Sequence, residues 1–173
     1  MNREESWPVR LAKESLRFYM AHSKIMPEAS GPLPPESAKR AGVFVSLKKK
    51  GQLRGGSGTI LPTQVDAARE IIRNAISAAT EDPRFDPVVA SELDDLDVSV
   101  DILGNPERVD SMDKLDPQRY GVIVRHAGRS GVLLPDLEGI DSASEQVSIA
   151  CRKAGIYPDQ TVELYRFEVV RYH

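Results

Sequence analysis

The fold is decided by residues 42–61, which read GVFVSLKKKGQLRGGSGTIL. Apolar residues alternate over 42–47, an extended pattern resumes over 53–61, and a lysine-rich segment with Gly51 separates the two runs. Alternation with a period of two is typical of a β-strand, and a glycine between two strands can adopt the positive φ of a tight turn. This stretch therefore predicts a β-hairpin whose second strand is unusually rich in glycine.

Helices are predicted on both sides of this hairpin. Apolar side chains recur at three- and four-residue steps over 8–22 and over 65–79, which is the spacing of an amphipathic helix. Thr63 or Asp66 can cap the second helix. Residues 23–41 are expected to form a loop, because they are rich in proline, which lacks the amide donor that helix and sheet require.

The main body of the domain, residues 42–173, continues as strands and helices. The expected elements are a loop over 80–87, a short turn or helix over 89–93, a strand over 98–102, a hairpin of 120–125 with 131–134, and a closing strand over 161–172. Ser142 to Glu145 matches a capping box and opens a helix that ends at Gly155. Strands that arrive as hairpins, without steady βαβ alternation, indicate an α+β fold with a mixed or mostly antiparallel sheet and packed helices.

Length and composition exclude several classes of protein. A chain of 173 residues fits a single domain, residues 1–173, and 40% hydrophobic residues suffice for a packed core. The formal net charge of −3 gives the whole chain no attraction for nucleic acid or anionic lipid. The one cysteine, Cys151, cannot form an internal disulfide, and no apolar run is long enough to span a membrane. We therefore expect a cytoplasmic protein that binds neither membrane nor nucleic acid.

The glycine-rich strand is the most unusual local feature. Its residues Arg54, Gly55, Gly56, Ser57 and Gly58 fit neither a Walker loop, nor a dinucleotide fingerprint, nor the nucleophile elbow of serine hydrolases. Glycines weaken a strand unless its backbone passes close to something. One interpretation is a ligand site, in which main-chain amides beside Arg54 receive a carboxylate or phosphate. The other is a bulge, or tight packing against a neighbouring element.

Charged residues and histidines give fewer candidates. His126 lies beside the turn of the second predicted hairpin with Arg125 and Arg129, where it could contact a ligand. No two of the three histidines stand four residues apart, so a helix-borne metal site is unsupported and we expect neither metal nor cofactor. Residues 38–54 are basic and contain no acid, whereas residues 81–116 contain twelve acids. This bias suits a partner protein, a locally bound anion or solvated turns.

Several strings, taken together and in this order, resemble the AMMECR family, whose prokaryotic members are called AmmeMemoRadiSam system protein A. They are Gly42-Val43-Phe44-Val45-Ser46-Leu47, Leu53-Arg54-Gly55 with Gly58-Thr59-Ile60, Asp82-Pro83-Arg84-Phe85, Gly121-Val122-Ile123-Val124, Gly128-Arg129-Ser130-Gly131-Val132-Leu133-Leu134-Pro135 and Lys153-Ala154-Gly155.

The resemblance implies a fold with a larger and a smaller α+β part, and it leaves activity open. The family's signature is Leu-Arg-Gly-Cys-Ile-Gly, whereas this chain has Gly56 in the cysteine place and Ser57 in the isoleucine place. Thiol chemistry at that position is therefore excluded for this chain. The family's prokaryotic name implies association with a Memo-like protein and a radical SAM protein.

Two functions are consistent with these patterns. The first is a non-catalytic binding or scaffold module for an anionic small molecule or a partner protein, centred on Arg54 and the glycine-strand amides. The second is an enzyme subunit of a radical-SAM-associated modification pathway that acts on an acidic substrate, with Arg54, Ser57 and either Arg84 or His126 around it. The sequence identifies no catalytic residue, because abundant carboxylates do not define an acid and base pair.

Overall fold

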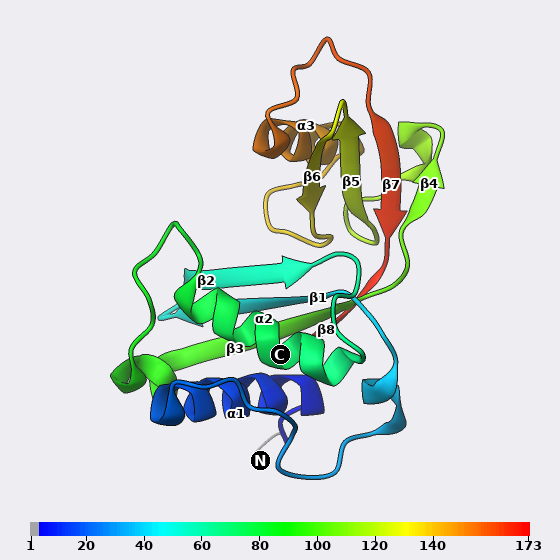
Figure 1. Ribbon diagram of the computed structural model, residues 1–173. Coiled ribbons are helices and arrows are strands. Elements are labelled where there is room, and N and C mark those ends of the chain that lie inside the picture. The colour runs from blue at the N-terminus through cyan, green and yellow to red at the C-terminus, as the bar shows by residue number, and fades with distance from the viewer. Residues whose placement is uncertain (1–3) are drawn as a thin grey trace. The chain divides into compact units, whose positions relative to one another are not determined.

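The chain divides into two compact units (Figure 1). The computed structural model describes residues 4–173, so residues 1–3 of the predicted domain lie outside the described residues. The larger unit runs to Leu103 and takes up the chain again from Val170 to His173, and the smaller unit is Gly104–Val169. Each has helices packed on an antiparallel sheet. The predicted α+β fold, with a larger and a smaller part, is therefore confirmed.

The sheet of the larger unit contains the predicted glycine-rich hairpin. Its strands, in the order β2-β1-β3-β8, are β1 (Val43–Lys49), β2 (Gln52–Thr59), β3 (Leu96–Leu103) and β8 (Val169–Tyr172). Lys50 and Gly51 form the turn between β1 and β2 with positive φ angles of 52° and 77°. Two-residue hairpin turns favour this combination. β2 is thus the outermost strand of its sheet, paired on one side only.

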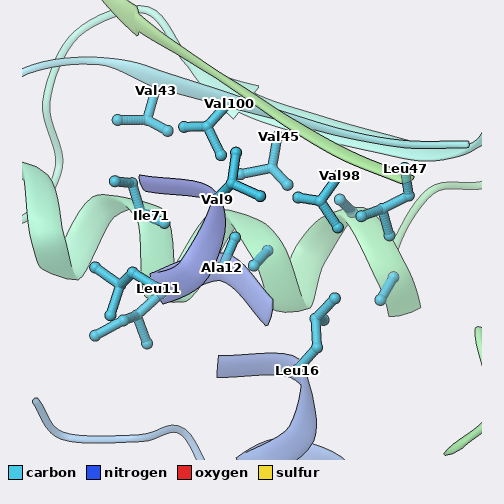
Figure 2. Packing of buried hydrophobic residues seen from close by; sticks show 14 of the residues in the cluster. Val9, Leu11, Ala12, Leu16, Val43, Val45, Leu47, Ile71, Val98 and Val100 are labelled. Carbon is cyan, nitrogen blue, oxygen red and sulfur yellow. The ribbon is translucent and has the colours of Figure 1, made fainter. Parts of the chain in front are cut away.

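Two long helices cover one face of this sheet, α1 (Trp7–His22) and α2 (Ala67–Thr80). Asp66 caps α2, since its carboxylate accepts a hydrogen bond from the Arg69 amide. Two short 3-10 helices, η1 (Pro35–Ala38) and η2 (Ala90–Asp95), lie in the connecting loops. Figure 2 shows the apolar core between helices and sheet, with the labelled residues Val9, Leu11, Ala12, Leu16, Val43, Val45, Leu47, Ile71, Val98 and Val100.

The smaller unit is built in the same way around a second sheet. Its strands, in the order β4-β7-β5-β6, are β4 (Glu107–Val109), β5 (Gly121–His126), β6 (Arg129–Leu133) and β7 (Glu163–Phe167). A short 3-10 helix, η3 (Met112–Lys114), precedes β5. α3 (Ala143–Ala154) packs on the sheet, capped by Ser142 and ended by Gly155 with a φ of 70°, as predicted. A Cβ on Gly131 would lie 2.1 Å from the Ala150 carbonyl oxygen, so α3 lies very close to β6.

The prediction of one closing strand over 161–172 is wrong. The segment forms two strands, β7 and β8, which belong to different sheets and are separated by Glu168. Both halves consist of β-forming residues with no glycine or proline between them, so the sequence pattern does not mark the change of sheet. β4 was not predicted, because two of its three residues are charged. No helix within residues 4–173 has the length and apolarity needed to cross a membrane.

Candidate functional site

Arg54, in the outermost strand β2 of the larger unit, forms hydrogen bonds with the loop that follows α2. Its guanidinium donates to both carboxylate oxygens of Glu92, at 3.1 and 3.2 Å, and to the carbonyl oxygens of Asp86 and Pro87. Lys49 donates to the same carboxylate at 3.1 Å. The Arg54 guanidinium is therefore already engaged inside the protein, and its evident role is to hold this loop against β2.

Two of the glycines in β2 are required by packing. A Cβ at Gly55 would lie 2.2 Å from the Ala78 carbonyl oxygen in α2, and a Cβ at Gly58 would lie 2.3 Å from the ring of Phe44. Carbon atoms cannot approach other atoms so closely without displacing them. Tight packing against neighbouring elements therefore accounts for these two positions.

Gly56 differs from both neighbouring glycines, because space remains beside it. A Cβ there would meet nothing nearer than Arg84 Nη2 at 3.6 Å and the Val45 carbonyl oxygen at 3.8 Å. The Gly56 amide points away from β1 and donates to Asp82 Oδ2 at 3.0 Å. Since alternate amides of an antiparallel strand face opposite edges, those of Gly55 and Ser57 face β1. The amides of residues 55–57, expected from the sequence to be open, are thus used within the protein.

Asp82 is a saturated hydrogen-bond acceptor beside Arg84. Its Oδ1 accepts from the Arg84 amide and from Nε, each at 3.0 Å, and its Oδ2 accepts from Nη2 at 2.7 Å as well as from Gly56. Hydrogen bonding by Arg84 and Gly56 to the charged form lowers the pKa of Asp82 to about 2. The Asp82 side chain is 5% exposed, whereas that of Arg84 is 60% exposed. Arg84 is therefore held in one orientation while it still reaches solvent.

The outer edge of the Arg84 guanidinium remains available. Asp82 uses Nε and Nη2 in a side-on pair, and no hydrogen bond from Nη1 occurs within residues 4–173. The guanidinium lies 5.5 Å from the centre of the Phe85 ring, a cation–π contact that helps to fix its plane. Parallel N–H donors on a guanidinium edge match the two oxygens of a carboxylate or phosphate. The bare position at Gly56 leaves room for such a group next to Nη2.

The basic residues of 38–54 and the acidic residues of 81–116 lie next to each other in the structure. Lys49 pairs with Glu92, and Lys48 stands opposite Asp97 in the β1–β3 ladder. The Val89 amide and the Arg54 guanidinium, which hydrogen-bond to the Glu92 carboxylate, lower its pKa to about 2. The lysine-rich turn and the acidic loop therefore stabilise each other.

The low pKa values of Asp82 and Glu92 predict acid sensitivity of the larger unit. Their ordinary values are 3.8 and 4.5, so the unfolded chain takes up protons more readily than the folded one. The two carboxylates therefore stabilise the fold above about pH 5, and this stabilisation is lost as the pH falls from about 4.5 to about 2. Allowing for screening by solvent, we expect roughly 1 kcal/mol from each carboxylate.

Glu92→Gln tests this expectation. The variant should unfold at lower urea concentration than the unmodified chain at about pH 7, and the difference should shrink as the pH falls to about 2, where the folded Glu92 carboxyl is about half protonated. A difference in unfolding free energy that is constant across this range would contradict the ionic role of Glu92.

The candidate nucleophiles have no activating neighbour in the described part of the chain. Ser57 Oγ makes no hydrogen bond to a histidine or carboxylate within residues 4–173. Burial raises the pKa of the Cys151 thiol, which lowers its nucleophilic fraction. Among the same residues, no three side chains of histidine, cysteine, aspartate or glutamate gather closely enough to hold a metal ion.

The predicted site residues fall in both units. Arg54, residues 55–58 and Arg84 come together at one edge of the larger unit, whereas His126 ends β5 in the smaller unit. Asp82 and Glu92, which organise the site, were not among the predicted residues. A signal for Asp82 exists in the sequence, because an aspartate two residues before an arginine in a proline-containing loop is typical of a side chain that bonds to the backbone of its own turn.

Comparison with known proteins places the chain in a family. Residues 9–172 match the family model described as AMMECR1. A protein of Thermotoga maritima is 50% identical over 169 residues, which cover 96% of this chain and 94% of that protein. Protein CA_C1420 of Clostridium acetobutylicum is 46% identical over 95% of this chain, which spans only 35% of that longer protein.

A solved structure has the same fold. The crystal structure of uncharacterized protein PH0010 from Pyrococcus horikoshii superposes with a TM-score of 0.88 at 32% sequence identity. The match covers 95% of this chain and 88% of that one. The chain therefore belongs to the AMMECR1 family.

Proposed function

We propose that this chain is a binding module that receives a carboxylate- or phosphate-bearing ligand, carried by a small molecule or a partner protein, at Arg84. The observation that carries the proposal is the side-on pair of Arg84 with Asp82, which leaves the outer edge of the guanidinium exposed beside the bare backbone of Gly56. The centre of the proposed site is thus Arg84 and not Arg54, whose donors hold the loop after α2.

The chemistry of the pair favours a planar, directional contact. Asp82 cancels the charge of Arg84 at short range, so attraction by net charge is weak. Binding then depends on two parallel hydrogen bonds from Nη1 and Nη2, which a carboxylate or a phosphate can both accept. Because Asp82 and the ring of Phe85 already fix the guanidinium, little conformational entropy is lost when a ligand binds.

The family supplies the first partners to test. Its resemblance to AmmeMemoRadiSam system protein A suggests a Memo-like protein and a radical SAM protein, each of which would have to present a carboxylate to Arg84. A role as a module is supported by the longer Clostridium protein, in which the matching region is a minor part of the chain.

Arg84→Gln is expected to weaken the binding of succinate and of inorganic phosphate at least about tenfold, because the variant cannot offer two parallel charged donors. Binding would be measured by NMR titration of a ¹⁵N-labelled sample, with the amide signals of Gly56 and Phe85 followed to saturation. The same variant should weaken association with a purified Memo-like or radical SAM protein if either is the partner.

Arg119→Gln is the matched control. Arg119 is also exposed, at 64%, pairs with Glu168 and lies over the ring of Tyr120 at 4.8 Å, but it belongs to the smaller unit. The Arg119→Gln variant should bind succinate and inorganic phosphate as tightly as the unmodified chain does. Equal binding by the Arg84 variant, or no saturable response of the unmodified chain to either anion, would contradict the proposal.

A further inference from the structure

We infer that the tip of the β5–β6 hairpin in the smaller unit is a second oxyanion site, suited to an anion that still carries a hydroxyl group, such as hydrogen phosphate. The tip borders a cavity of about 440 Å³. Its lining residues are Arg125, His126, Ala127, Gly128, Arg129, Ser130 and Glu163. This site is separate from Arg84 and does not depend on the function proposed above.

His126 is oriented by the backbone. Its Nδ1 lies 2.6 Å from the carbonyl oxygen of Thr161, just before β7. Since a carbonyl oxygen can only accept a hydrogen bond, Nδ1 carries the proton and donates. In the neutral ring Nε2 is then an acceptor, and no partner for it occurs within residues 4–173. An acceptor beside positive charge selects a ligand that has both negative charge and a hydroxyl hydrogen.

Two guanidinium groups supply the positive charge. Arg125 lies over the ring of Tyr165, with its central carbon 4.9 Å from the ring centre, so its edge donors are not used by this contact. Arg129 donates through Nη1 to the Gly155 carbonyl oxygen at the end of α3, and its other nitrogens keep donors. Both contacts restrain the guanidinium groups near the turn and leave hydrogen-bonding capacity for an anion.

The lining has more positive than negative charge. Glu163 is its one carboxylate, and it is engaged by the Tyr165 hydroxyl at 3.1 Å and by Arg108 at 3.8 Å. The turn itself adds no bulky side chain, because Ala127 and Gly128 form it with positive φ angles of 47° and 80°. An anion can therefore approach Arg125 and Arg129 past a small and fixed turn.

The test is an NMR titration of the imidazole signals of the full chain with inorganic phosphate and with sulfate. At about pH 8, where imidazole groups are ordinarily neutral, phosphate is a dianion that retains one hydroxyl and sulfate is a dianion without one. The three histidines give three sets of signals, which His22→Gln and His173→Gln assign. We expect phosphate to shift the His126 signals saturably, with little response at His22 and His173, and we expect sulfate to shift them far less.

Variants separate this site from Arg84 and from a failure to fold. Arg125→Gln and Arg129→Gln should each weaken the phosphate response of His126 about tenfold, whereas Arg84→Gln and Arg119→Gln should leave it unchanged. If one of the two hairpin variants does not fold, a roughly tenfold weaker phosphate response of His126 in the other variant is enough to support the inference. No shift at His126, the same shift at all three histidines, or an equal response to sulfate would overturn the inference.

Discussion

Gly55→Ala is expected to destabilise the larger unit by about 3 kcal/mol, which would lower its melting temperature by roughly 10 °C. The added Cβ would lie 2.2 Å from the Ala78 carbonyl oxygen. That oxygen belongs to the backbone of α2, so it cannot turn away as a flexible side chain would. Relief requires α2 and β2 to move apart, which opens the core between them. Thermal unfolding followed by circular dichroism would measure the change.

The adjacent residue provides the matched control. At Gly56 the nearest atoms to an added Cβ are 3.6 and 3.8 Å away, so Gly56→Ala should change the free energy of unfolding by less than about 1 kcal/mol. Two glycines that adjoin in the sequence should therefore differ widely in their response to the same substitution. Similar losses at both positions would show that strand propensity, and not contact with α2, governs this region.

Asp101→Ala is expected to cost about 3 kcal/mol, because it removes the buried carboxylate of an ion pair whose guanidinium is largely shielded from solvent. Arg171 in β8 donates to Asp101 in β3 through Nε and Nη2, each at 2.8 Å, and the Asp101 side chain is only 5% exposed. The variant would remove the main counterion of a guanidinium whose side chain is only 22% exposed. Urea unfolding would measure the loss, together with faster amide exchange in β8.

The controls for Asp101 use a double variant and an exposed pair. Arg171→Met with Asp101→Ala should be less unstable than the sum of the two single losses, since the double variant removes both charges of the pair. Glu168→Gln breaks an ion pair with Arg119 whose two side chains are 59% and 64% exposed, and should cost no more than about 1 kcal/mol. Equal costs for Asp101→Ala and Glu168→Gln would show that burial gives the Asp101 pair no special weight.

Local sequence patterns predicted most of the fold because they act over short distances. The hairpin at Gly51, the cap at Asp66 and the helix from Ser142 to Gly155 each depend on residues a few positions apart. Periodicity alone placed both long helices of the larger unit. The AMMECR resemblance supplied the division into a larger and a smaller part.

The organisation of the candidate site could not be predicted in the same way. Asp82 reaches Gly56 across 26 residues, and Glu92 reaches Arg54 across 38. Nothing local distinguishes Glu92 from the other acids in its stretch, and the local signal at Asp82 concerns its own turn and not Gly56. The sequence suggested open amides beside an unpaired guanidinium at Arg54. Only the tertiary fold shows that Glu92 accepts hydrogen bonds from Arg54 and that Asp82 accepts one from the Gly56 amide.

The chain leaves the larger unit after Leu103 and re-enters it at Val170, so the whole smaller unit is inserted between the adjoining strands β3 and β8. On the ribosome, β3 emerges with Asp101 well before the strand that carries Arg171. The smaller unit, whose strands all lie within one continuous segment, can complete its sheet first. The larger unit, although its synthesis starts earlier, is therefore completed last. Asp101 can pair with Arg171 only after the smaller unit has been synthesised.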